Sequence, residues 1–201
     1  MPGPLPLDGI TVVSLEQAVA APFATRQLAD LGARVIKIER PGGGDFARHY
    51  DRTVRGQSSY FVWLNRSKES VVLDLKSPSG LAALRALVAK ADVVLQNLAP
   101  GALGRLGLSP DQMRAEHPGL VVCSISGYGP DGPWSDRKAY DLIVQCETGL
   151  PTLTGTPDVI ARAGISVADI AAGMYAFSGT LAALLRRART GEGGHVDISL
   201  F

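Results

Sequence analysis

Asp169 is the residue of this sequence whose type and setting best suit covalent chemistry. It precedes an apolar run that reaches Leu185 and ends in arginines, and its neighbours are small: Ala168, Ala171, Ala172 and Gly173. The run predicts a buried helix with Asp169 at or near its N-terminus, where backbone N–H groups and the helix dipole favour an ionised carboxylate. The simpler interpretation is a helix N-cap. The alternative is a nucleophile, with space beside it for a substrate carbonyl.

Other residues able to bind a ligand follow the predicted strands. Arg40 opens a glycine-rich segment, 40–45, whose backbone can approach a ligand closely and whose guanidinium suits a phosphate. Asn97 and Arg105 bound a second segment, which offers an amide, apolar side chains and a cation. Segment 127–134 is rich in Pro and Gly and holds two aromatic residues. Each segment is also typical of an ordinary loop, and no dinucleotide-type GxGxxG motif is present.

Strand-like and helix-like stretches alternate along the chain. Apolar, β-branched runs predict strands at 10–15, 34–39, 71–75, 93–95 and 120–125, and amphipathic runs predict helices from Pro22, over 78–90 and over 111–116. This alternation indicates an α/β fold with an open, mostly parallel sheet and flanking helices. Ligands bind such sheets at the carboxyl ends of the strands, where the segments above begin.

The composition excludes several classes of function. The net charge is +1 without a basic block, which argues against nucleic acid or an anionic membrane as a partner. The two cysteines form neither a disulfide framework nor a metal-binding spacing, so we expect no metal and a reducing, cytoplasmic setting. The first residues do not resemble a signal peptide, and no uninterrupted apolar run reaches the ~18 residues of a membrane span.

Several segments together resemble one family, in order and at matching spacing. They are 7–10, 33–41, 73–78, 97–103, 127–133, 168–169 and 190–193. The series is similar to the class III coenzyme A transferases (CaiB/BaiF type), a family that also contains α-methylacyl-CoA racemases and carnitine CoA-transferases. Each segment is weak evidence alone, but the series is specific and extends from Leu7 to the last residue.

The resemblance implies a Rossmann-like large domain that binds coenzyme A. It implies that Asp169 attacks an acyl-CoA thioester and that the reaction passes through a mixed anhydride and an aspartyl–CoA thioester. The acyl-CoA and a carboxylic acid acceptor would be substrates, with no permanently bound cofactor. The family's CoA contacts fall on Ala18, Arg40, Leu73, Asn97, Leu98, Arg105, Leu106, Lys138 and Tyr140.

Three departures from the family pattern limit the assignment. Val19 stands where formyl-CoA transferases have a glutamine, which argues against formate–oxalate exchange. Tyr140-Asp141 stands where the racemases have His-Asp, and tyrosine is the poorer base at neutral pH, which argues against a racemase. Family members also extend well beyond Phe201, which the resemblance places within a strand of the large domain, so residues 1–201 resemble the N-terminal portion of that domain, without the small domain and the return segment. Full-length family members form an interlocked homodimer. Because the resemblance covers only the N-terminal portion, a non-catalytic CoA-binding module is the alternative.

The segment 138–157 and the residues around Asp169 look most like the branch that handles C4–C5 dicarboxylates, including succinyl-CoA-dependent and mesaconyl-CoA transferases. A free carboxylate near Asp169 would need a cation or several donors. We expect these from hydroxyls and one arginine: Thr148, Thr152, Thr154, Ser166 and Arg162. Such a polar pocket would exclude long acyl chains, because unpaired donors would be buried against them.

Overall fold

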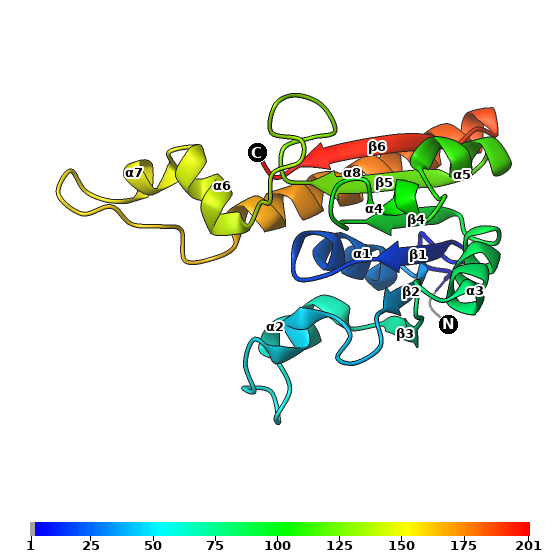
Figure 1. Ribbon diagram of the computed structural model, residues 1–201, viewed down its shortest axis with the longest axis horizontal. Helices are drawn as coiled ribbons and strands as arrows, with labels where there is room; N and C mark the ends of the chain where they lie inside the picture. The colour runs from blue at the N-terminus through cyan, green and yellow to red at the C-terminus, as the bar shows by residue number, and fades with distance from the viewer. Residues whose placement is uncertain (1–2) are drawn as a thin grey trace.

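The computed structural model describes residues 3–201 and contains one six-stranded sheet (Figure 1). All five strand pairs are parallel, in the order β3-β2-β1-β4-β5-β6. The strands are β1 Thr11–Leu15, β2 Arg34–Glu39, β3 Lys68–Val72, β4 Val93–Gln96, β5 Val121–Ser126 and β6 Gly194–Ser199. This is the strand order of a Rossmann-type doubly wound sheet, so the predicted fold class is confirmed.

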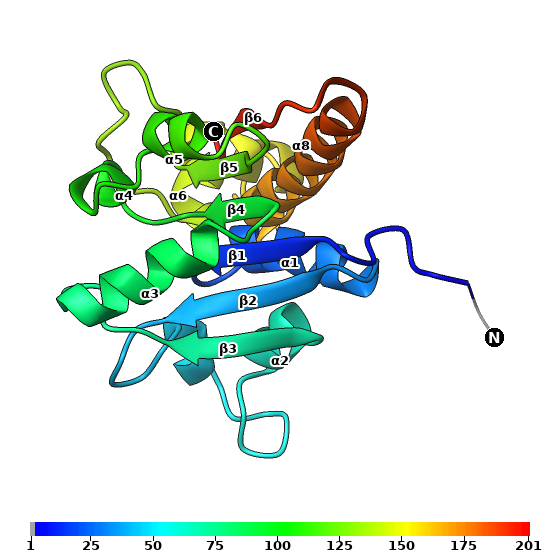
Figure 2. The same ribbon diagram turned by 90° about the vertical axis from the view of Figure 1, so that its right-hand side faces the viewer.

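The helices cover both faces of the sheet (Figure 2). They are α1 Ala20–Asp30, α2 Ser59–Asn65, α3 Pro78–Val88, α4 Ala102–Arg105, α5 Pro110–Glu116, α6 Asp141–Glu147, α7 Leu150–Thr154 and α8 Val167–Thr190, with a 3-10 turn η1 Phe46–His49. The inward side chains of α3, α4 and α5 form the core on one face, and those of α1 and α8 form it on the other. Apolar residues that alternate along the strands supply both cores, as the buried runs predicted.

Two strand positions differ from the sequence expectation. The strand expected at 71–75 is β3, which begins at Lys68 and ends at Val72. It lies at the edge of the sheet and its side chains are only partly buried, so its apolar pattern is weak and its register follows its pairing with β2. Phe201 was expected within a strand, but β6 ends at Ser199.

Helix α8 is longer than the sequence pattern suggested. By length and composition alone, its 24 residues are apolar enough to span a membrane. The sequence did not indicate this, because polar residues interrupt the apolar run. Core helices of soluble domains pass the same test, and one face of α8 packs against α1 and the sheet. The expectation that the helix is buried is wrong for its other face, where Met174, Tyr175 and Leu185 are exposed. The packing is close at Gly173, where an added Cβ would lie 2.6 Å from the Ala20 carbonyl oxygen. Gly173 thereby brings the start of α1 next to the first turns of α8.

The sheet places the loops that follow β1, β2, β4 and β5 at one edge. The chain order reverses between β1 and β4, and ligands of such folds bind at this switch point, beyond the carboxyl ends of the strands. Helices α6 and α7 project beyond that edge, at the left of Figure 1. Asp169 enters the same region from the first turn of α8.

Candidate active site

Two adjoining cavities open at the carboxyl edge of the sheet. The Asp169 cavity, about 360 Å³, is bounded by the loops after β1, β4 and β5, by η1 and by the start of α8. The Arg40 cavity, about 180 Å³, is bounded by the loops after β1, β2 and β3. Gln17 and Leu98 line both cavities. One elongated molecule can therefore lie across this shared wall, with one end near Arg40 and the other near Asp169.

Asp169 lies in the first turn of α8 but is not its N-cap. The helix begins after Ser166, whose side chain caps nothing. The cap comes from α6: Asp141 Oδ1 accepts the N–H of Ala168 at 2.8 Å and that of Asp169 at 3.4 Å. The predicted position near a helix N-terminus is confirmed, and the N-cap interpretation is wrong because Asp141 occupies that role.

The expectation that Asp169 stays ionised is also wrong. Burial, together with the nearby charge of Asp141, raises the pKa of its carboxyl group to about 7. No donor within residues 3–201 forms a hydrogen bond to the Asp169 carboxylate, and Asp141 occupies the helix amides that would otherwise stabilise it. Near neutral pH both the acid and the reactive carboxylate are therefore populated.

This raised pKa predicts a pH-dependent stability. The folded protein holds the Asp169 proton to about pH 7, whereas an unfolded aspartate loses it near pH ~4. The free energy of unfolding therefore falls as the pH rises from ~4 to about 7, and the charged Asp169 destabilises the fold fully above that pH. We expect Asp169→Asn to exceed wild type in unfolding free energy by roughly 2–4 kcal/mol at pH 8 and by much less at pH 5. Urea titrations at both pH values measure this. The matched control is Asp111→Asn, which replaces an exposed carboxylate in the first turn of α5. The assignment would be contradicted if the difference in unfolding free energy from wild type grew equally between pH 5 and pH 8 in Asp111→Asn, or did not grow in Asp169→Asn.

The N-terminus of α1 faces the same cavity without a cap. Val19, the N-cap residue, makes no side-chain capping bond, and no acidic residue lies in the first turn. Within residues 3–201, the N–H groups of Val19, Ala20 and Ala21 have no hydrogen-bond partner, and Val19 and Ala20 line the Asp169 cavity. Unpaired amides at a helix N-terminus stabilise negative charge, so they are suited to an oxyanion that forms near Asp169.

The Arg40 cavity has both a basic and an apolar side. Arg40 donates from Nε to the Gly44 carbonyl at 3.0 Å, which holds the glycine-rich loop against the cavity. Leu73 and Leu98 contribute an apolar surface. Such a combination suits a phosphorylated nucleotide, with the anionic groups at the guanidinium and the base on the leucines.

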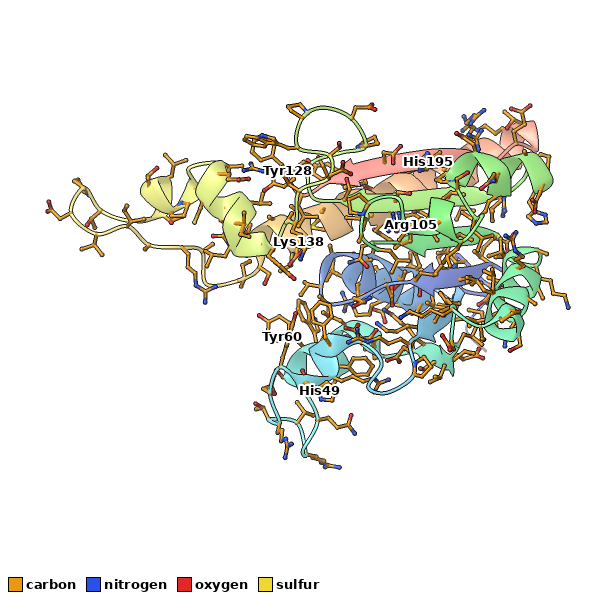
Figure 3. All side chains as sticks on the ribbon, in the orientation of Figure 1. His49, Tyr60, Arg105, Tyr128, Lys138 and His195 are labelled. Carbon is orange, nitrogen blue, oxygen red and sulfur yellow. The ribbon has the colours of Figure 1, made fainter. Side chains whose placement is uncertain are left out.

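Most of the predicted site residues converge on these two cavities. Ala18, Asn97, Leu98, Lys138, Tyr140 and Asp169 line the Asp169 cavity, and Arg40 and Leu73 line the Arg40 cavity. Arg105 and Leu106 line neither. Arg105 is the exposed last residue of α4 (Figure 3) and donates to the Pro100 carbonyl. Leu106 packs on the core. Lys138 lies near α6, at the carboxyl edge (Figure 3).

Asn97 lines the Asp169 cavity and also holds the loop after β1 in place. Its Oδ1 accepts the N–H of Gln17 at 2.9 Å, and its Nδ2 donates to the Gln17 carbonyl at 2.9 Å. The second N–H of the carboxamide leaves one donor for the predicted ligand contact.

The hydroxyl groups expected beside Asp169 do not lie there. The hydroxyls of Thr148, Thr152 and Thr154 donate to nearby backbone carbonyls of α6, α7 and their connection. None of the five residues proposed for a carboxylate pocket lines the Asp169 cavity; the cations that do are Arg137 and Lys138. Threonines on short helices satisfy their hydroxyls locally, which the sequence pattern does not reveal.

Several residues of the site had no role in the sequence analysis. Phe46, the first residue of η1, and Tyr50, its C-cap residue, line the Asp169 cavity. Burial and the charges of Asp45 and Asp169 raise the pKa of Tyr50 to about 12, so its hydroxyl is a donor at neutral pH. Their position directly after the glycine-rich segment is the one signal that would have suggested them. Within residues 3–201 no three His, Cys, Asp or Glu side chains group as a metal site would require.

Comparisons with known proteins agree with this architecture. Residues 7–201 match the family model of CoA-transferase family III. The chain is 43% identical, over 98% of its length, to the acetyl-CoA:oxalate CoA-transferase of Acetobacter aceti, and 43% identical, over 97%, to the succinate–glutarate CoA-transferase of Agrobacterium fabrum. It covers 51% of each, so it spans about half the length of these curated relatives. A CaiB/BaiF family protein from Brucella suis superposes with a TM-score of 0.93 at 40% identity, over 99% of this chain and 54% of that one.

Proposed function

The chain belongs to CoA-transferase family III, and on that basis we propose that the protein transfers coenzyme A between carboxylic acids, with Asp169 as the covalent nucleophile and C4–C5 dicarboxylic acids as substrates. The observation that carries the proposal is the setting of Asp169. A half-buried carboxylate without a hydrogen-bond partner in residues 3–201 shares a cavity with the uncapped start of α1, and a second cavity suited to a nucleotide adjoins it.

The first half of the reaction releases the donor acid. The Asp169 carboxylate attacks the thioester carbonyl, and the C–S bond breaks to give a mixed anhydride and CoA thiolate. The thiolate then attacks the Asp169 carbonyl of the anhydride, the C–O bond to the donor acyl group breaks, and the donor leaves as a carboxylate. An aspartyl–CoA thioester remains. Covalent catalysis thus replaces one difficult exchange by easier acyl transfers.

The second half repeats these steps with the acceptor. Its carboxylate attacks the aspartyl thioester and releases CoA thiolate, which forms a second mixed anhydride. The thiolate attacks the acceptor's carbonyl, so that the new acyl-CoA leaves and the Asp169 carboxylate returns. No oxidant, reductant or net proton transfer is required. Each tetrahedral oxyanion forms beside Asp169. The unpaired amides of Val19 and Ala20 line the same cavity, which supports α1 as the helix that stabilises the oxyanion.

Two features support short dicarboxylic acids. Arg137 and Lys138 line the Asp169 cavity and can pair with a second, free carboxylate of the substrate. Both relatives at 43% identity are named for dicarboxylic acids; succinate and glutarate of the Agrobacterium fabrum relative are C4 and C5 acids and support that size, whereas oxalate of the Acetobacter aceti relative is a C2 acid. Both cations are exposed, and Arg137 pairs with Glu147 at 3.5 Å, so they favour an acid with a second carboxylate because a long alkyl chain offers them no partner.

The test is transfer from succinyl-CoA to a panel of acids by the intact protein, followed by chromatography of the acyl-CoA products. We expect succinate, glutarate, mesaconate and citramalate to be the best acceptors, formate and long branched acids the poorest, and Asp169→Asn to be inactive with all of them. Faster transfer to oxalate or to a branched long-chain acid than to the C4–C5 acids would contradict the substrate class. Exchange of an α-proton with deuterated water, without transfer, would contradict the reaction itself.

A further inference from the structure

The turn between β1 and α1 is strained and lies at the wall that the two cavities share. Ala18 adopts a left-handed conformation with φ 62°, which is uncommon for a residue that has a Cβ. Gln17 lines both cavities, and Ala18 and Val19 line the Asp169 cavity. Strained backbone persists only where surrounding groups hold it, and it concentrates at functional sites. The groups that hold this turn therefore help to determine the geometry of the site.

Two side chains from distant parts of the sequence hold the turn. Asn97 clamps Gln17 through the two hydrogen bonds described above. Asp45 holds the next residue: its Oδ1 accepts the N–H of Ala18 at 3.0 Å and that of Ala47 at 2.9 Å. Asp45 therefore joins the loop after β1 to the loop after β2.

Asp45 is itself held in place on every side. Its side chain is fully buried, and its Oδ2 accepts from Lys37 Nζ at 2.7 Å. Its own N–H donates to Glu39 Oε2 at 2.9 Å. Lys37 is equally buried and also donates to Asn65 Oδ1 at 2.9 Å. A carboxylate that is paired and hydrogen-bonded at both oxygens in the interior has little freedom to move, so it is a rigid anchor for Ala18.

We propose that Asp45 is a positioning residue for the acyl transfer: by accepting the Ala18 N–H it keeps Ala18 left-handed, and this sets the direction in which the unpaired first-turn amides of α1 meet Asp169. The inference rests on the proposed function. Ala18 directly precedes the N-cap residue Val19, so its backbone angles determine where α1 begins. A shift of the turn would move the amides of Val19 and Ala20 relative to the Asp169 carboxylate, while Arg40 and Leu73 would stay in place.

The test uses Asp45→Asn in the intact protein. Asparagine has one acceptor oxygen, so it cannot replace Oδ2 toward Lys37 and Oδ1 toward the amides of Ala18 and Ala47 at the same time. The buried Lys37 ammonium requires that oxygen more than the neutral amides do, so the side-chain NH2 group would face the Ala18 N–H and the hydrogen bond to Ala18 would be lost, although the shape of the side chain is unchanged. We expect kcat to fall by about 10- to 100-fold, the usual effect of a small misplacement of catalytic groups. Ala18→Gly, added to Asp45→Asn, should restore most of the lost kcat, because glycine adopts a positive φ without strain. If Asp45 served only to stabilise the fold, adding Ala18→Gly would not restore kcat.

The matched control is Asp92→Asn, at the other end of β1. Asp92 also accepts a backbone N–H, from Thr11 at 2.8 Å, and also pairs with a cation, Arg187 at 3.0 Å. We expect it to lower stability and to leave kcat unchanged. Asp45→Asn with the kcat of wild type, or a double variant no faster than Asp45→Asn alone, would overturn the proposal.

Two measurements keep the outcomes separate. Wild-type transfer is measured first: its absence would defeat the proposed function, whereas equal transfer by wild type and Asp45→Asn would defeat only the role of Asp45. If Asp45→Asn does not fold, hydrogen exchange of the Ala18 amide in the wild-type protein decides the question. We expect that amide to exchange as slowly as the amides of β1, and rapid exchange would overturn the proposal.

Discussion

Asp169→Ala and Asp169→Asn should both abolish CoA transfer, with a loss of at least about 10³-fold in kcat, as expected when a covalent nucleophile is removed. Neither variant retains an oxygen nucleophile at this position. Asn keeps the shape of the side chain, and Asp169 makes no hydrogen bond through its carboxylate within residues 3–201, so both variants should fold. Free CoA should bind to them with nearly unchanged affinity, because the Arg40 cavity is intact.

A chemical trap tests the same assignment directly. Incubation of the wild-type protein with succinyl-CoA and then hydroxylamine should convert Asp169 to a hydroxamate, which mass spectrometry of the digested protein can locate. Asp141→Asn is the matched variant, since Asp141 lies beside Asp169 and should not itself be acylated. A hydroxamate on another carboxylate, or substantial transfer by Asp169→Ala, would remove Asp169 from the mechanism.

The second large effect concerns the binding of CoA. Arg40→Ala should weaken the affinity for CoA by roughly 10- to 100-fold at low salt, the usual cost of about 1–3 kcal/mol for losing a charged hydrogen-bond partner. The loss should shrink in high salt, where screening already weakens the contact. Calorimetric titration of CoA into each variant at two salt concentrations measures both effects.

Two other arginines complete this experiment. Arg105→Ala should also weaken CoA binding if the nucleotide extends past Leu98 toward α4, as the family resemblance implies. Arg34 lies at the opposite end of β2, where it pairs with Glu69 in solvent, so Arg34→Ala is the matched control and should leave the affinity unchanged. Unchanged affinity in both Arg40→Ala and Arg105→Ala would mean that the loops at the carboxyl edge do not bind the nucleotide.

Local patterns in the sequence were sufficient to predict the fold. Short β-branched runs such as 34–39 and helices that start on Pro78 or Pro110 are determined by backbone preference and by apolar periodicity, and their alternation requires parallel crossovers. The same patterns placed Asp169 in the first turn of a core helix. They were least reliable at the edge strand β3, where burial is partial and pairing with β2 decides the register.

What only the tertiary structure decided is which polar groups meet. Asp141 reaches the amides of α8 from another helix, and burial then raises the pKa of Asp169, although a helix N-terminus alone would lower it. Asp45 meets Ala18, and Asn97 meets Gln17, across 27 and 80 residues of sequence. A hydrogen bond or a desolvation energy depends on distances between segments that are remote in the chain, and no periodicity within one segment encodes them. The sequence by itself therefore determined the elements and the candidate nucleophile, while the packing of those elements determined the proton affinity of the nucleophile and the groups that hold the site together.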